Sequence, residues 1–144
     1  MVASIGIRPP ASGTRVSGTE TGSEFVAPIK SFRDLEVWRR AMDLSHTVYD
    51  LTRQLPDDER FGLVSQLRRS SISVPSNIAE GFGRGSRVDY LRFLRVARGS
   101  LYEVETQLLF CVERGLIRNA EKAEQHIQSC GQMLAALIRT LETR

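Results

Sequence analysis

The chain has 144 residues, which is typical of one domain, and 41% of them are hydrophobic, enough to form a core. No apolar run approaches the roughly 18 residues that span a membrane and no secretory signal is present, so we expect a cytoplasmic protein without membrane contact. The net charge is only +3, and two cysteines and two histidines are too few for a disulfide framework or a typical zinc site, so neither a metal nor a cofactor is expected.

Residues 1–30 are predicted to form a disordered leader. Gly, Ser, Thr and Pro dominate this segment, and it shows neither the period of a strand nor that of a helix. The string Gly22–Phe25 also resembles the translation of two adjacent cloning sites, which makes part of the leader a candidate for vector-derived sequence. We therefore place the folded domain at residues 31–144.

From Phe32 onward the apolar residues recur with the period of an α-helix in four successive runs. The runs are bounded by Ser31 and Pro56, by Leu63 and the glycine-rich residues 81–85, by Ser86 and Gly115, and by Asn119 and the end of the chain. Ser31 and Ser86 are predicted to cap the first and the third helix. Their apolar spacing predicts a buried seam that includes Val37, Ala41, Leu44, Val48, Leu51, Leu55, Leu63, Leu67, Ser71, Val74, Ile78, Leu94, Ala97, Leu101, Val104, Leu108, Cys111, Ile127, Cys130, Leu134, Leu137 and Leu141. Four such helices joined by short links predict an all-α, antiparallel, up-and-down four-helix bundle.

Pro75 lies inside the second run. A proline in a helix interior removes a backbone donor and presses on the carbonyl four residues earlier, here that of Ser71, at a cost of about 3 kcal/mol. The apolar spacing stays in phase across Pro75, which predicts one helix kinked at this residue in preference to two short helices. The hydroxyls of Ser70, Ser71 and Ser73 are candidates to bond the carbonyls freed by the kink.

Residues 65–81 read SQLRRSSISVPSNIAEG, and this string resembles the bacterial family of proteins encoded in intervening sequences of 23S rRNA genes. Shorter matches flank it, and the resemblance extends approximately from Phe32 to Leu116. It implies a four-helix bundle that assembles into homopentamers. Relatives of this fold include the accessory variability proteins of diversity-generating retroelements, in which a basic pentamer holds a reverse transcriptase and its template RNA.

The positive charge of the chain is concentrated in residues 82–102, which carry five arginines and one aspartate. At 100° per residue, Arg87, Arg92, Arg95 and Arg98 occupy about 140° of one side of the third helix, and Arg84 precedes them. Arginine pairs with phosphate through two parallel hydrogen bonds, so this face is a candidate site for the RNA or DNA backbone. A face that is solvated or ion-paired to other helices or subunits is the alternative.

Arg68 and Arg69 flank the second helix, where they can either extend this basic face or pair with the acidic residues 57–59. We include both arginines among the candidate nucleic-acid contacts.

The conspicuous polar residues of the resembling string are Asn77 and Glu80. Neither histidine nor a second carboxylate stands one turn from Glu80, so we expect no catalytic site and no enzyme activity. Polar groups inside bundles often determine register or partner choice, and we predict a structural or interface role for Pro75, Asn77, Glu80 and Gly81. Glu80 would bond Ser76, Asn77 or a neighbouring subunit, and Gly81 would be the C-cap of the helix.

The sequence thus predicts a non-enzymatic homo-oligomeric bundle that binds nucleic acid through the arginines of its third helix, with RNA as the first candidate. The resemblance adds a reverse transcriptase as a potential partner. The alternative is an oligomeric protein-interaction module whose arginines pair across subunits and which has no affinity for nucleic acid.

Overall fold

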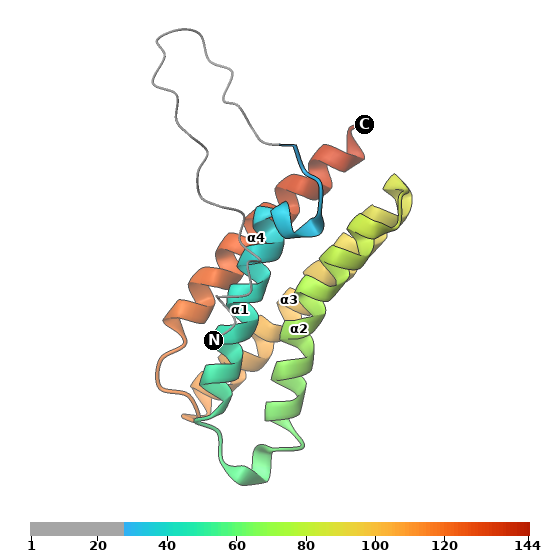
Figure 1. Ribbon diagram of the computed structural model, residues 1–144. Coiled ribbons are helices and arrows are strands. Elements are labelled where there is room, and N and C mark those ends of the chain that lie inside the picture. Colours follow the sequence, from blue (N-terminus) through green and yellow to red (C-terminus); the bar gives the residue numbers. More distant parts are fainter. Residues whose placement is uncertain (1–27) are drawn as a thin grey trace, which may run out of the picture.

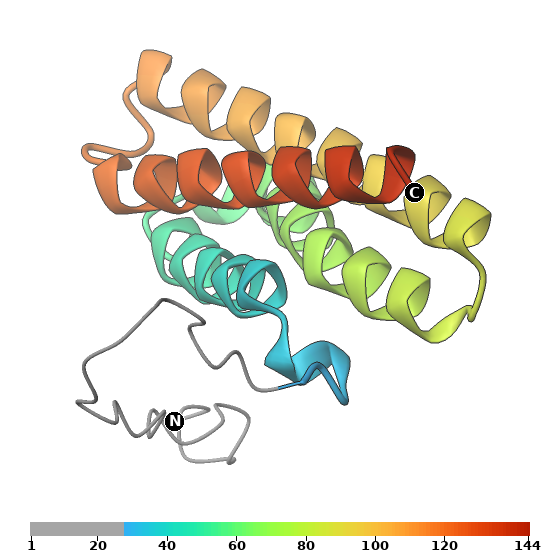
Figure 2. The same ribbon diagram turned by 90° about the horizontal axis from the view of Figure 1, so that it is seen from above.

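The computed structural model describes residues 28–144, and within this range it contains four α-helices and no strand. The helices are α1 (Glu36–Thr52), α2 (Leu63–Gly83), α3 (Arg87–Glu113) and α4 (Glu121–Glu142), with 3₁₀ turns at Phe32–Asp34 and Asp57–Glu59. Each helix packs against the next, and α4 returns to pack against α1 (Figures 1 and 2). The predicted up-and-down four-helix bundle is therefore confirmed, while residues 1–27 of the predicted leader lie outside the described residues.

One continuous apolar core runs through the bundle, and all four helices contribute to it. The predicted seam of α3 is buried at every position, and the seams of α1 and α2 are buried with the exception of the half-buried Leu51 and Leu63. In α4 the seam shifts near its end, because Ile138 is buried while Leu137 and Leu141 are half-buried. A fully buried leucine or isoleucine contributes about 1.5–3 kcal/mol, so this core is the main source of stability.

The chain enters the bundle through a capped 3₁₀ turn. The Ser31 hydroxyl accepts a hydrogen bond from the backbone N–H of Arg33, and the Asp34 carboxylate accepts one from the backbone N–H of Ser31. Leu35 then adopts an extended backbone, and α1 begins at Glu36. The prediction that Ser31 caps the first helix is therefore wrong, since Ser31 caps the turn that precedes it.

Gly81 lies inside α2 and not at its end, so the prediction that it is the C-cap is wrong. The helix continues to Gly83, Arg84 is the C-cap, and Gly85 makes the turn into α3 with a φ of +75°. A β-carbon at position 81 would lie 2.8 Å from Cβ of Phe93 and 3.3 Å from the carbonyl oxygen of Tyr90. Glycine at this position therefore allows α2 and α3 to approach closely.

Pro75 is buried in the middle of α2. Because it has no backbone N–H, the carbonyl of Ser71 lacks its usual partner in the helix and instead accepts a hydrogen bond from a hydroxyl of another helix. The Ser45 Oγ atom of α1 lies 2.9 Å from the carbonyl oxygen of Ser71 and 3.0 Å from that of Ala41. The local serines bond elsewhere, Ser71 itself to the carbonyl of Arg68, so the predicted local compensation is wrong. The proline thereby couples α2 to α1, and the kink itself stays a prediction.

This coupling can be measured with a double-mutant cycle. Ser45→Ala should destabilise the bundle by about 1–2 kcal/mol, because it leaves the buried Ser71 carbonyl without a partner. In a Pro75→Ala background the new backbone N–H can bond Ser71, so the same change should cost less by about 1 kcal/mol. Urea unfolding of the four proteins gives the coupling energy.

Thr47→Val is the matched control for this cycle. Thr47 is also buried in α1 and bonds a carbonyl of its own helix, that of Asp43, at 2.9 Å. Its coupling to Pro75→Ala should be close to zero. A Ser45 coupling no larger than that of Thr47 would show that Ser45 does not compensate for the proline.

The close approach at Gly81 gives a second prediction. Gly81→Ala should destabilise the protein by about 1–3 kcal/mol, because the added methyl group would collide with Phe93 at the α2–α3 contact. Gly83→Ala, two residues away in the same helix, meets no atom within 4 Å and should be neutral or stabilising. The midpoints of thermal unfolding of the two variants test this prediction, and equal midpoints would refute the steric role of Gly81.

Candidate nucleic-acid interface

The first turns of α3 present the predicted arginines, and the local sequence explains where this helix starts. Ser86 is extended, and its hydroxyl accepts a hydrogen bond from the backbone N–H of Asp89 at 3.1 Å. Asp89 lies in the first turn, where a carboxylate interacts favourably with the helix dipole. Leu94 and Ala97 are buried in the core, so the arginines on the remaining part of the circumference reach the surface.

Two of the five arginines gather around one aromatic ring beside the end of α2. The guanidinium carbons of Arg84 and Arg92 lie 4.9 and 4.8 Å from the centroid of the Phe93 ring. Arg84 donates to the Glu80 carboxylate at 2.8 Å, and Arg92 is 3.5 Å from the Asp89 carboxylate. Because Phe93 also contacts the position of Gly81, the packing of α2 on α3 determines where these two arginines lie.

Two further arginines hold the end of α4. Arg87 donates to the backbone carbonyl of Leu141 at 3.3 Å, and Arg95 donates to the Glu142 carboxylate at 2.6 Å. Cations near a helix C-terminus are favoured by the helix dipole. Arg98 is half-buried and makes no ion pair with any residue that the structure describes.

The resulting surface keeps a positive excess. The five arginines, Arg84, Arg87, Arg92, Arg95 and Arg98, meet three carboxylates in ion pairs, those of Glu80, Asp89 and Glu142. The paired side chains remain exposed, and surface ion pairs of this kind contribute only about 0–1 kcal/mol. Such a surface can bind anions, because a phosphate can share a guanidinium with its weakly held carboxylate or displace that carboxylate.

Arg68 and Arg69 do not join this surface in the same way. Arg68 donates from Nε to the Thr52 hydroxyl at 2.9 Å, and its guanidinium carbon lies 4.5 Å from the centroid of the Tyr49 ring. Arg68 is therefore held against α1 and is not bonded to the acidic residues 57–59. Arg69 is exposed on α2.

The polar residues of the string at 65–81 mainly connect elements within the protomer. Asn77 donates to the carbonyl oxygen and to the hydroxyl of Ser73, at 2.8 and 2.9 Å, and the Ser73 hydroxyl lies 2.9 Å from that of Ser100 in α3. Pro75 and Gly81 are buried inside the protomer. Glu80 bonds Arg84, so the predicted bond to Ser76 or Asn77 is wrong, and its predicted contact with a neighbouring subunit stays a prediction.

Burial also alters the pKa values of two cysteines in the core and of the half-buried His126. Burial raises the pKa of Cys130 to about 12 and also raises that of Cys111, so both stay protonated thiols. Burial lowers the pKa of His126, whose Nδ1 atom has no hydrogen-bond partner within the described residues. Within residues 28–144 no three His, Cys, Asp or Glu side chains are grouped to hold a metal ion, and no helix there is long and apolar enough to cross a bilayer.

Sequence reasoning missed several residues that matter here. Ser45, Glu142 and the carbonyl of Leu141 reach their partners across the bundle, and no local pattern announces such contacts. The only signal was a serine at position 45, directly after the buried Leu44 of the predicted seam.

Comparison with known proteins identifies one family. The family model described as 23S rRNA-intervening sequence protein matches residues 33–137, which include the string at 65–81 and parts of all four helices. A search of curated proteins found no match. Since the matched range covers most of the chain, this protein belongs to the 23S rRNA-intervening sequence protein family.

Proposed function

We propose that this protein is a non-enzymatic, homo-oligomeric bundle that binds the phosphate backbone of nucleic acid through the exposed arginines of α3 and of the preceding turn. RNA is the first candidate for this nucleic acid. The observation that carries the proposal is the gathering of five arginines, Arg84, Arg87, Arg92, Arg95 and Arg98, at one end of the bundle, where among residues 28–144 only three carboxylates make ion pairs with them. Arg69 is a secondary candidate, whereas the contacts of Arg68 with α1 argue against a direct role.

The geometry suits a sequence-independent contact. A guanidinium group has five N–H donors, and each ion pair seen here uses one nitrogen, so further donors remain for phosphate oxygens. The stacking of Arg84 on Phe93 restricts its side chain before a ligand arrives, which lowers the entropic cost of binding. If five copies assemble, their basic faces add up to a stronger field than one protomer produces.

The family resemblance extends this proposal to a cellular setting. An accessory protein of a diversity-generating retroelement would hold a reverse transcriptase and its RNA. A reverse-transcriptase gene next to the gene of this protein would support that role, and its absence would limit the proposal to nucleic-acid binding by an intervening-sequence protein.

A second candidate function is an oligomeric protein-interaction module without nucleic-acid affinity. The observation that favours it is a set of exposed apolar side chains on α3, which include Val88, Val96, Tyr102, Leu109 and Phe110. In this case the arginines would pair with carboxylates of neighbouring subunits.

RNA binding is tested by its salt dependence. Each phosphate contact releases counterions, so log affinity should fall linearly with log salt concentration by about 0.7 per contact on single strands. Replacing Arg87, Arg95 and Arg98 by Gln should lower RNA affinity more than tenfold at about 0.1 M salt and reduce this slope. Fluorescence anisotropy of a labelled RNA measures both quantities.

The matched control replaces Arg53, Arg114 and Arg118, which are exposed near the loops at the opposite end of the bundle, by Gln. This variant loses the same charge and should bind RNA with an affinity close to that of the parent. If both variants lose RNA affinity equally, the loss follows from net charge and not from the position of the arginines. A parent protein without salt-dependent binding would refute the proposed function.

Assembly gives a separate prediction. We expect light scattering coupled to size exclusion to report five protomers at micromolar concentration, because the family resemblance implies a homopentamer. The measurement has to be made with and without RNA at two salt concentrations. A parent that stays monomeric in all conditions contradicts the assembly and the summed field, but leaves phosphate binding by one protomer open to the anisotropy measurement.

A further inference from the structure

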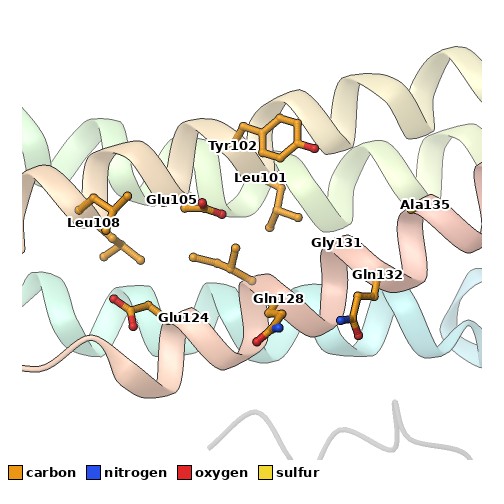
Figure 3. A pocket seen from close by; sticks show the side chains of 11 residues that line it. Leu101, Tyr102, Glu105, Leu108, Glu124, Gln128, Gly131, Gln132 and Ala135 are labelled. Atoms are coloured by element: carbon orange, nitrogen blue, oxygen red, sulfur yellow. The ribbon is translucent and has the colours of Figure 1, made fainter.

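A groove with a volume of about 620 Å³ runs along the surface between α3 and α4 (Figure 3). Leu101 and Leu108 of α3 point into the space between the two helices, and Ile127 of α4 lines it as well. On the α4 side, Gly131 and Ala135 leave room that larger side chains would fill. The interior of the groove is therefore apolar although it is open to solvent.

The rim of this groove is acidic on both sides. Glu105 projects from α3 and Glu124 from α4, and the polar neighbours Gln128 and Gln132 follow along α4 (Figure 3). Among the residues that the structure describes, no basic side chain lines the groove and neither glutamate makes an ion pair. An occupant that fits this surface has an apolar ridge with a positive charge on it.

The first half of α3 carries a surface with these properties. Val88, Arg92 and Val96 follow one another at intervals of four residues, and we call them the basic strip. Val88 is 73% exposed and Val96 is 48% exposed, whereas none of the other valines of the helices is exposed. Arg92 stands between the two valines, and its contact with Asp89 is long, at 3.5 Å.

The two surfaces also agree in length and position. Val88 and Val96 are about 12 Å apart along the helix, and the groove side of α4 from Glu124 to Ala135 spans about 16 Å at 1.5 Å per residue. Around α3, Arg92 and Glu105 are separated by about 140°, so the basic strip and the groove lie on different faces. One protomer can therefore offer both surfaces at the same time.

We propose that the groove between α3 and α4 receives the basic strip of a second copy of this chain. Val88 and Val96 would pack on Tyr102 and Leu109, the apolar side chains of the groove that are exposed, and Arg92 would lie between Glu105 and Glu124. A contact between two different faces is heterologous and produces a ring when the rotation closes. The inference rests on the assembly proposed above, and it assigns Arg92 to the subunit contact while the other arginines of the basic face remain available to phosphate.

A charge reversal with rescue tests this contact. Glu105→Lys with Glu124→Lys should raise the dissociation constant of the assembly more than tenfold, because two positive charges would then face Arg92. Adding Arg92→Glu to the same chain restores opposite charges and should restore assembly, whereas Arg92→Glu alone should weaken it. Sedimentation velocity over a dilution series, with circular dichroism to verify folding, measures each variant.

Glu113→Lys with Glu121→Lys is the matched control, since both residues are exposed on the same two helices outside the groove. This control should assemble like the parent. The proposal is overturned if the groove variant assembles like the parent, if the control fails equally, if Arg92→Glu does not rescue, or if the parent is monomeric. Failure of RNA binding is distinguishable, because assembly would still respond to the charge swap while the anisotropy of the labelled RNA would not change.

Discussion

The contact between α2 and α3 is the constraint on which the candidate interface depends. Gly81 brings the two helices together over Phe93, and the hydroxyls of Ser73 and Ser100 meet further along the same contact. Phe93 in turn lies beneath Arg84 and Arg92. A bulkier residue at 81 would therefore move the helices apart and also displace the ring on which two of the arginines stack.

The helices and most of the core could be predicted because they follow from local periodicity. Leu101, Val104 and Leu108 are buried as their spacing indicates, and Ser86 caps α3 as expected. The helix ends were less predictable, because Gly81 looked like a C-cap in the sequence but acts as a packing residue. Glycine serves both purposes, and only the position of α3 distinguishes them.

The candidate site was predictable in its location but not in its bonding. The arginine cluster is visible in the sequence, whereas the partners of Arg87 and Arg95 come from the far end of the chain and depend on how α4 returns to α3. The same holds for Ser45, which compensates for Pro75 from another helix. The charge pattern of the groove was hidden for a further reason, since Glu105 and Glu124 lie 19 residues apart and become neighbours only in the folded bundle.

The outward side of α3 carries two kinds of side chain that have different requirements. The arginines that bond the end of α4 keep their positions in the absence of a ligand or second subunit, because Leu141 and Glu142 hold them. Their surface contacts are weak, so they can exchange them for phosphate at little cost in free energy. The two valines of the basic strip have no such support, since exposed valines gain stability only when another surface covers them. The burial of apolar area therefore favours a protein surface over the strip, and the loose charge pairs favour an anion beside it. Assembly and nucleic-acid binding can then coexist on one helix, because each uses a different part of its circumference.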